Sequence, residues 1–398
     1  MNKILFLPLF QMPSGHHHAA DAIIDGLKSR SEEIECKKID FLSDISPFLE
    51  KSVASFYLKW IKASPKTYNL AYQRFSYTNE PDKKPYLWYE RLFLNKMEQL
   101  IIREKPTLII CTHGFPSYFV SRLKMKHKIN IPVINIYTDF FINDIWGKEG
   151  IDYHVVPNLR IKKQLEKNDR VSPERIICSG IPVHEVFTEK IKISPLENKE
   201  NYSILVAGGS SGLGNMSELL EEVRSSNADF KILCGNNGEL YEQIVNLNHE
   251  KITPVPYLSS KQAMNKLYEE CDAIVTKPGG ITISEALKKH LPIFIHSSLP
   301  GQEKINEEFL AKEGLVFLLN KENSYIDQMM NVLEDPILLR DYLRKVENYN
   351  QQLESSIQVV YSIVEKIILE GQRSYVIAHS LKQHRFPFLK RMTSKYNH

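Results

Sequence analysis

Short apolar runs alternate with stretches of helical period along most of this chain. It begins with a strand-like run at 2–10, a helical pattern at 16–30 and a second strand-like run at 34–42. The alternation resumes after residue 99, with strands expected at 107–111, 133–137, 153–156 and 175–179 and helices at 115–126 and 159–167. Apolar strands separated by helices predict a parallel sheet covered on both faces. We therefore expect the first part of the chain to form a Rossmann-like α/β domain.

A second series of the same kind follows a polar stretch at 188–201, which we interpret as a linker. Its expected elements are strands at 203–207, 230–234, 273–275 and 291–296 and helices at 216–225, 238–247 and 281–289. Helical patterns return at 324–369, and the last, 339–370, is long enough to cross back over the first domain. We predict two facing Rossmann-like domains, at 1–187 and 202–345, a returning helix at 346–370 and a tail at 371–398.

The region 44–99 interrupts the first series and is rich in Phe, Tyr and Trp, with more Lys and Arg than Asp and Glu. This combination suits an interface with lipid. The tail at 371–398 carries six Lys and Arg residues and no Asp or Glu. Such a tail either attracts anionic lipid headgroups or is a disordered, solvated segment.

Length and composition indicate a two-domain globular protein, with 398 residues, 42% of them hydrophobic and 25% charged. No apolar run reaches the roughly 18 residues that spanning a bilayer requires. The first apolar run contains Pro8 and no cleavage site follows it, so we interpret it as a strand rather than a signal peptide. Five scattered cysteines without a CxxC pair fit a reducing cytoplasm. We expect a cytoplasmic protein attached peripherally to a membrane, with no nucleic-acid partner.

The stretch 277–285 carries the clearest chemical signal. Gly279 and Gly280 stand between an apolar run and a helical pattern, so their amides can approach a phosphate at the positive end of a helix dipole. Glu285 falls about one turn into that helix, where its carboxylate can accept hydrogen bonds from ribose hydroxyls. After the next strand come Gln302 and Glu303, which are suited to reading sugar hydroxyls. Together these features predict a nucleotide-sugar site.

A second glycine-rich loop, at 207–214, lies between a predicted strand and helix. Gly208, Gly209 and Ser210 can bind a diphosphate through their amides. The loop lacks the lysine of a Walker motif, and the acidic residues that follow it come too early for NAD binding. The loop therefore supports a nucleotide-sugar site.

The paired motifs KPGGxTxxEA and PGQExxN resemble the C-terminal half of the glycolipid glycosyltransferases related to processive diacylglycerol glucosyltransferase and monogalactosyldiacylglycerol synthase. The resemblance extends from residue 1 to about 370 and implies the GT-B fold, with two facing Rossmann-like domains and a cleft between them. It also implies a UDP-sugar as donor substrate, inversion at the anomeric carbon and no metal or other cofactor. The further donor-binding residues that it implies are Gly235, Asn236, Lys277, Thr282, Gly301 and Asn306.

The loop after the first strand contains three histidines, His16, His17 and His18. It resembles the family's GxGHxxxA loop, which makes His16 the candidate base for the acceptor hydroxyl. A helix N-terminus would lower the pKa of His16, because the dipole disfavours imidazolium. The alternatives are a structural helix-start residue and a metal site, although neighbours on a helix point about 100° apart. Pro13 and Ser14 stand where the family has glycines.

Shorter matches indicate the acceptor side. Asp139 and Trp146 belong to a stretch that resembles the family's TDFxxHxxW, with Asn143 in place of its histidine. Asp139 can hold an acceptor hydroxyl or cap the next helix. Pro116 follows His113 at the end of a predicted strand that faces the cleft. Pro116 matches a family position near the acceptor, or is an ordinary first-turn proline.

We therefore predict an enzyme that moves a hexose from UDP-glucose or UDP-galactose to diacylglycerol or its monoglycosylated product at a membrane surface. Two alternatives stay open. A UDP-sugar epimerase shares the fold and the donor loops. A non-catalytic protein that binds UDP or lipid is suggested by the altered loop at Pro13 and by Asn143.

Overall fold

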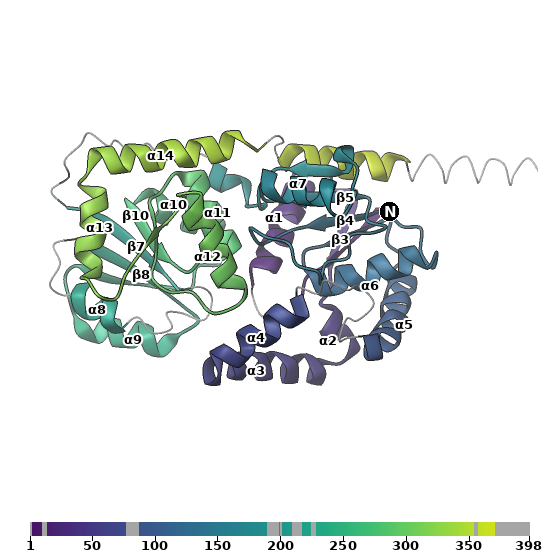
Figure 1. Ribbon diagram of the computed structural model, residues 1–398, viewed down its shortest axis with the longest axis horizontal. Helices are drawn as coiled ribbons and strands as arrows, with labels where there is room; N and C mark the ends of the chain where they lie inside the picture. Colours follow the sequence, from purple (N-terminus) through teal and green to yellow (C-terminus); the bar gives the residue numbers. More distant parts are fainter. Residues whose placement is uncertain are drawn as a thin grey trace, which may run out of the picture.

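The structure is a computed structural model that describes residues 2–9, 14–76, 87–188, 199, 201–208, 217–223, 228–353 and 357–370. Gly209, Ser210, most of the expected linker and the basic tail at 371–398 lie outside these ranges. The described chain forms two α/β domains side by side (Figure 1). None of its helices has both the length and the apolar character needed to cross a bilayer. All five cysteines are free thiols.

The first domain is built on a six-stranded parallel sheet in the order β2-β1-β3-β4-β5-β6. Its strands are β1 (Asn2–Leu7), β2 (Ile34–Lys38), β3 (Leu108–Cys111), β4 (Val133–Ile136), β5 (Tyr153–Val156) and β6 (Ile176–Cys178). Short 3-10 turns flank β6 at Pro173–Arg175 and Glu185–Thr188. The predicted parallel sheet is confirmed.

The second domain repeats this design, with a parallel sheet in the order β12-β11-β10-β7-β8-β9. Its strands are β7 (Ser203–Ala207), β8 (Asp229–Gly235), β9 (Ile252–Pro256), β10 (Ala273–Thr276), β11 (Ile293–Ile295) and β12 (Phe317–Leu318). The carboxyl ends of parallel strands share one edge of a sheet, and ligands of open α/β sheets bind beyond that edge.

Both faces of the first sheet are buried because its strands are apolar at successive positions. Ile4 and Phe6 pack under α1 (Gly15–Lys28) and the helical segment 357–370. Leu5 and Leu7 belong to the opposite face, which is covered by α5 (Leu87–Glu104), α6 (Gly114–Met125) and α7 (Leu159–Lys167). The alternation follows from the period of two along a strand.

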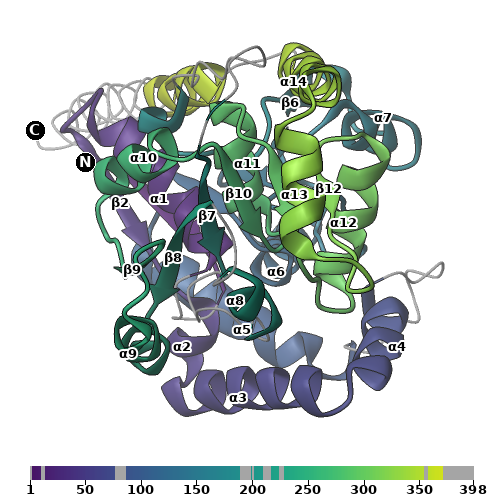
Figure 2. The ribbon, with the colours of Figure 1, turned by 90° about the vertical axis from the view of Figure 1, so that its left-hand side faces the viewer.

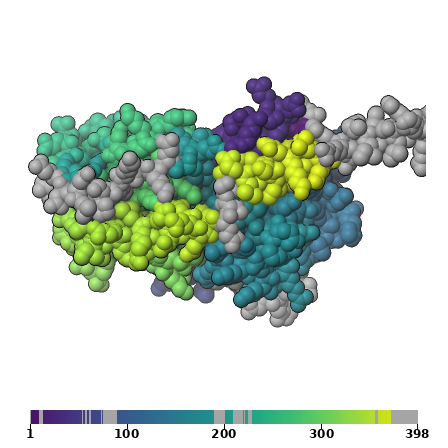
Figure 3. Space-filling view, turned by 90° about the horizontal axis from the view of Figure 1, so that it is seen from above, coloured from purple at the N-terminus to yellow at the C-terminus, as the bar shows by residue number. Residues whose placement is uncertain are grey.

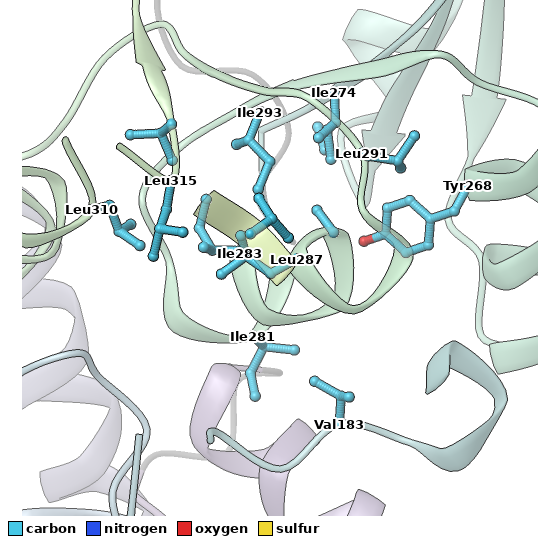
Figure 4. Packing of buried hydrophobic residues seen from close by; sticks show 14 of the residues in the cluster. Val183, Tyr268, Ile274, Ile281, Ile283, Leu287, Leu291, Ile293, Leu310 and Leu315 are labelled. Carbon is cyan, nitrogen blue, oxygen red and sulfur yellow. The ribbon is translucent and has the colours of Figure 1, made fainter. Parts of the chain in front are cut away.

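The helices of the second domain also form two layers. One face of its sheet packs against α8 (Ser217–Val223), α9 (Gly238–Leu247) and α13 (Tyr325–Leu333). The other packs against α10 (Lys261–Glu269), α11 (Gly280–Lys289), α12 (Gln302–Lys312) and α14 (Pro336–Gln351). In Figure 4, Ile283 and Leu287 of α11 lie beside Ile293, whereas Ile281 lies toward Val183 of the first domain. This apolar cluster therefore joins the two domains.

The chain returns to the first domain after α14, as predicted, but not as one continuous helix. The expected helix at 339–370 is wrong in its continuity, because α14 ends at Gln351 and the next described helical segment is 357–370. Figure 3 shows this segment, in bright yellow, against the first domain. There Tyr361 occupies the space above Gly26, where a Cβ would lie 2.0 Å from the tyrosine hydroxyl.

Two further predictions in the first domain need correction. The strand expected at 34–42 ends at Lys38, because Asp40 caps a short helix, α2 (Phe41–Ile45), by accepting from the N–H of Leu42. The described part of region 44–99 forms the end of α2, α3 (Pro47–Ala63), α4 (Pro65–Ser76) and most of α5, whereas residues 77–86 lie outside the described ranges. One face of its last part is core, since α5 contributes Leu94, Met97, Leu100 and Ile101 to the buried cluster. In Figure 2, α3 and α4 lie along the lower edge of the molecule.

Candidate active site

A cavity of about 400 Å³ lies between the two domains. Its walls include the first residues of four helices, which begin at Gly15 (α1), Lys261 (α10), Gly280 (α11) and Gln302 (α12). Each helix N-terminus presents backbone N–H groups without intrahelical partners and a partial positive charge. Four such ends around one cavity suit it to an anionic ligand.

His16 lies in the first turn of α1 and lines this cavity. Its Nδ1 is 3.0 Å from the carbonyl oxygen of Thr112 and 2.8 Å from the hydroxyl oxygen of Thr138. A carbonyl oxygen only accepts, so this contact assigns the ring proton to Nδ1 and leaves the lone pair on Nε2. Burial lowers the pKa of His16 and outweighs the opposing charge of Asp139. The lowered pKa was predicted from the helix dipole, and the structure adds burial as a cause.

His113 packs edge-on against His16, with ring centroids 4.6 Å apart. Its Nδ1 accepts from the N–H of Phe115 and caps α6. Burial lowers the pKa of His113 well below its usual value. This histidine is therefore a neutral capping residue that packs against the candidate base. Its position after β3 predicted that it would face the cleft, but it does not line the cavity.

Asp139 joins the two domains across the cavity. Its carboxylate accepts from Nε2 of Gln302 at 2.6 Å and from Nδ2 of Asn306 at 2.9 Å. The oxygen of the Asn306 amide accepts from the N–H of Phe140 at 2.9 Å. The capping alternative for Asp139 is wrong, because the next helix begins only at Leu159. Asp139 instead places the two α12 amides next to the base.

Glu285 lines the cavity from the second turn of α11. Its carboxylate accepts from the hydroxyl of Tyr268 at 2.8 Å. Burial raises the pKa of Glu285 to about 7, against the opposing effects of Tyr268 and of the charge of Lys261. Additional hydroxyl donors, such as those of a ribose, would favour its ionised form.

The two glycines at the start of α11 have different surroundings. A Cβ at Gly279 would meet no other atom within 4 Å, whereas a Cβ at Gly280 would lie 2.0 Å from the carbonyl oxygen of Thr138. Gly279 therefore leaves open space in the cavity, as a phosphate approach requires. Gly280 allows the backbones of the two domains to touch, and the approach of a phosphate to the amides of the two glycines stays a prediction.

Three further residues that were predicted to bind the donor substrate line the cavity: Gly235, Thr282 and Glu303. Gly235 has φ +56° at the end of β8, which favours glycine. Glu303 accepts from the N–H of Leu299 at 2.6 Å, and burial raises its pKa while the charge of Lys277 lowers it.

Several predicted residues lie behind or beside the cavity rather than in its walls: Gly208, Asn236, Lys277, Gly301, Pro116 and Trp146. Gly301 has φ +90° and packs against Tyr68 and Tyr72 of α4, which approach the position of its missing Cβ to 3.0 and 3.2 Å. Pro116 is buried in α6, and Trp146 packs against Tyr137 with the rings tilted by 54° and their centroids 4.5 Å apart. These two residues are part of the core in this structure, so direct contact with an acceptor stays a prediction.

Sequence reasoning assigned no binding or catalytic role to several residues of the cavity wall, among them His18, Lys261 and Tyr68. Lys261 directly follows Ser260, whose hydroxyl caps α10, so a capping pattern was the available signal. His16 and His18 do not converge on one point, because Nδ1 of His18 meets Lys261 while Nδ1 of His16 meets Thr112. Among the described residues, no three His, Cys, Asp or Glu side chains are grouped as metal ligands.

Two family models together match most of the chain. The model for monogalactosyldiacylglycerol (MGDG) synthase matches residues 16–183, and that for the glycosyltransferase family 28 C-terminal domain matches residues 203–348. The glycosyltransferase YkoN of Bacillus subtilis (strain 168) is 38% identical over 374 residues, which cover 92% of this chain and 98% of that protein. This chain belongs to the family 28 glycosyltransferases.

More distant relatives agree with this assignment. Processive diacylglycerol beta-glucosyltransferase of Bacillus cereus (strain G9842) is 28% identical to this family 28 glycosyltransferase over 335 residues, covering 82% of this chain and 84% of that protein. Among solved structures, MurG of Acinetobacter baumannii superposes with a TM-score of 0.59 at 14% identity, covering 92% of this chain and 100% of that one. The predicted GT-B fold and the predicted family are confirmed, and the family favours a transferase over the epimerase alternative.

Proposed function

We propose that this family 28 glycosyltransferase moves a hexose from UDP-glucose or UDP-galactose to diacylglycerol or glycosyldiacylglycerol. The observation that carries the proposal is the placement of His16 in one cavity with Gly279 and Glu285. One wall offers a neutral base, and the other offers space for phosphate and a carboxylate for ribose. Relatives named as diacylglycerol glucosyltransferases support the acceptor class.

The proposed reaction is a single displacement. Nε2 of His16 takes the proton of the acceptor hydroxyl while that oxygen attacks the anomeric carbon. The bond from this carbon to the diphosphate oxygen breaks on the opposite side, and UDP leaves with the electron pair. The anomeric centre is therefore inverted. The charge of Asp139, which favours the imidazolium form of His16, stabilises the proton after its transfer.

The departing diphosphate needs positive charge nearby. The N-termini of α10, α11 and α12 and the ammonium group of Lys261 supply it in the cavity walls. We propose that these groups serve in place of a catalytic metal ion. Full activity in the presence of a chelator would agree with this role, and restoration of lost activity by a divalent cation would contradict it.

The α3–α4 pair supports a lipid acceptor. Three of its large apolar side chains are strongly exposed, with Phe48 at 81%, Phe56 at 64% and Leu70 at 71%. Exposed lysines accompany them: Lys51, Lys59 and Lys66. Apolar and basic side chains together suit a membrane surface with anionic headgroups.

An aromatic path leads from this surface to the cavity. The rings of Phe56 and Trp60 lie 5.5 Å apart, those of Trp60 and Tyr68 lie 5.8 Å apart, and Tyr68 lines the cavity. We propose that the acceptor lies along this path, with its hydroxyl at His16 and its acyl chains toward α3.

The decisive experiment incubates the full chain with diacylglycerol vesicles and a panel of UDP-sugars, followed by mass spectrometry of the lipids and of the nucleotides. We expect a hexosylated lipid and an equal amount of UDP. An isomerised UDP-sugar without released UDP would instead support the epimerase alternative. Binding of UDP and of vesicles without consumption of any UDP-sugar would support the non-catalytic alternative.

A further inference from the structure

Lys261 and His18 form a contact across the interdomain cavity. Nζ of Lys261, at the start of α10, lies 3.0 Å from Nδ1 of His18 in α1. Burial, followed by the charge of Lys261, lowers the pKa of His18 to about 4. The histidine is therefore neutral near pH 7 and accepts the hydrogen bond from the ammonium group. The contact pairs a full positive charge with an uncharged acceptor.

The charge balance of the cavity makes this contact unusual. Asp139, Glu285 and Glu303 contribute carboxylates to its walls, whereas Lys261 is the single Lys or Arg side chain among the described wall residues. Other lysines near α1 have carboxylate partners, such as Lys38 with Asp21 at 2.6 Å. Within the part of the chain that the structure describes, no carboxylate forms an ion pair with Lys261.

We propose that Lys261 binds the diphosphate of the nucleotide sugar and that His18 is its partner only while the site is empty. This inference rests on the proposed use of a UDP-sugar donor. A phosphate oxygen is a stronger acceptor for an ammonium group than a neutral imidazole, because both partners are then charged. The four-carbon stem of lysine allows the exchange without movement of α10. Lys261 also lies close enough to Glu285 for its charge to act on the candidate ribose carboxylate.

Binding of UDP and of uridine by the full chain tests the proposal, because uridine lacks the diphosphate. We expect Lys261→Met to weaken UDP binding by about tenfold or more, the effect of losing one charge-assisted contact, and to leave uridine binding unchanged. Lys261→Arg should restore most of the UDP affinity. Lys266→Met is the matched control, since Lys266 lies on the same helix with a side chain 78% exposed.

The His18→Ala variant tests the second part of the proposal. Removing a partner that competes with the diphosphate should leave UDP affinity unchanged or increase it, and weaker UDP binding would overturn the role assigned to His18. Equal UDP affinity in the wild type and Lys261→Met, or parallel losses for UDP and uridine, would overturn the role of Lys261 alone. A wild-type protein that binds no UDP would overturn the proposed donor and this inference together. Thermal melting of each variant confirms that it is folded.

Discussion

The Cα of Gly280 faces the carbonyl oxygen of Thr138 so closely that a Cβ at this glycine would lie 2.0 Å from that oxygen. Gly280 starts α11 in the second domain, and Thr138 directly precedes Asp139 in the first. This contact sets the distance between the helix start that we assign to phosphate and the wall that carries His16. The proposed geometry of transfer therefore depends on a residue that lacks a side chain.

Gly280→Ala should force the two domains apart, while Gly279→Ala serves as its control. We expect Gly280→Ala to lower the free energy of unfolding by about 1–3 kcal/mol, as overpacking does. Gly279 has φ −83° and open space around its missing Cβ, so Gly279→Ala should melt like the wild type. The methyl group added by Gly279→Ala should nevertheless reduce UDP affinity, because it would occupy the space proposed for phosphate. Similar melting temperatures for both variants would contradict the assigned contact.

His16→Ala should lower the rate of lipid glycosylation by about 100-fold or more, the usual contribution of a general base. UDP affinity should be retained, since the assigned role concerns the acceptor proton. In the wild type, burial lowers the pKa of His16, so the acid limb of the kcat/KM profile should lie below the ordinary histidine value of about 6.5. Unchanged turnover in His16→Ala would rule out this residue as the base.

Asp139→Asn should shift that acid limb further toward low pH. The charge of Asp139 favours the protonated form of His16, so its removal lowers the pKa of the imidazole and leaves more neutral base in acid. The rate at the pH plateau should fall, because the imidazolium formed during transfer loses its nearby negative charge. Asparagine preserves the side-chain shape. If the Asp139→Asn variant kept the pH–rate profile of the wild type, the role of Asp139 would be limited to joining the domains.

Glu285→Gln should stabilise the protein at alkaline pH. It should also weaken nucleotide binding, because it removes the carboxylate proposed to bind ribose. The pKa of Glu285 rises to about 7 in the folded protein from its usual 4.5. The folded state therefore holds a proton that the unfolded state releases, and stability falls as pH rises from 4.5 to 7. A shift of this size corresponds to about 3 kcal/mol. The variant should melt above the wild type at a pH of about 8 and like the wild type near pH 4.5, the usual pKa of the glutamate carboxyl. The reverse order at the alkaline pH would contradict the assigned burial cost.

Phe56→Ser should reduce transfer to diacylglycerol in vesicles by about fivefold or more, since burying a Phe side chain contributes about 1.5–3 kcal/mol. UDP affinity and transfer to a soluble short-chain diacylglycerol should be retained. Leu338→Ser, on α14 of the second domain, removes another exposed apolar side chain and is the control. Equal vesicle activity in both variants would remove α3 from the proposed membrane surface.

The sequence determined the local elements and the chemistry of separate loops. Strands of alternating apolar faces, such as β1 with Ile4 and Leu5, depend on neighbouring residues, and their period is visible in the chain. The two glycines before α11 and the position of His16 in a helix start were predictable for the same reason. The helix cap at Asp40 was harder to predict, because Asp40 lies within the strand-like run expected at 34–42 and starts α2 there.

Only the tertiary structure decided which loops meet. The bond between Asp139 and Asn306 joins residues 167 positions apart, and the contact between His18 and Lys261 joins residues 243 positions apart. No local pattern encodes such pairs, since they depend on the closure of two separately folded domains. Closure also gives the adjacent glycines different roles, with Gly279 facing the cavity and Gly280 facing Thr138. The physical reason is that sequence period fixes the face on which a residue lies, whereas domain packing fixes what that face meets.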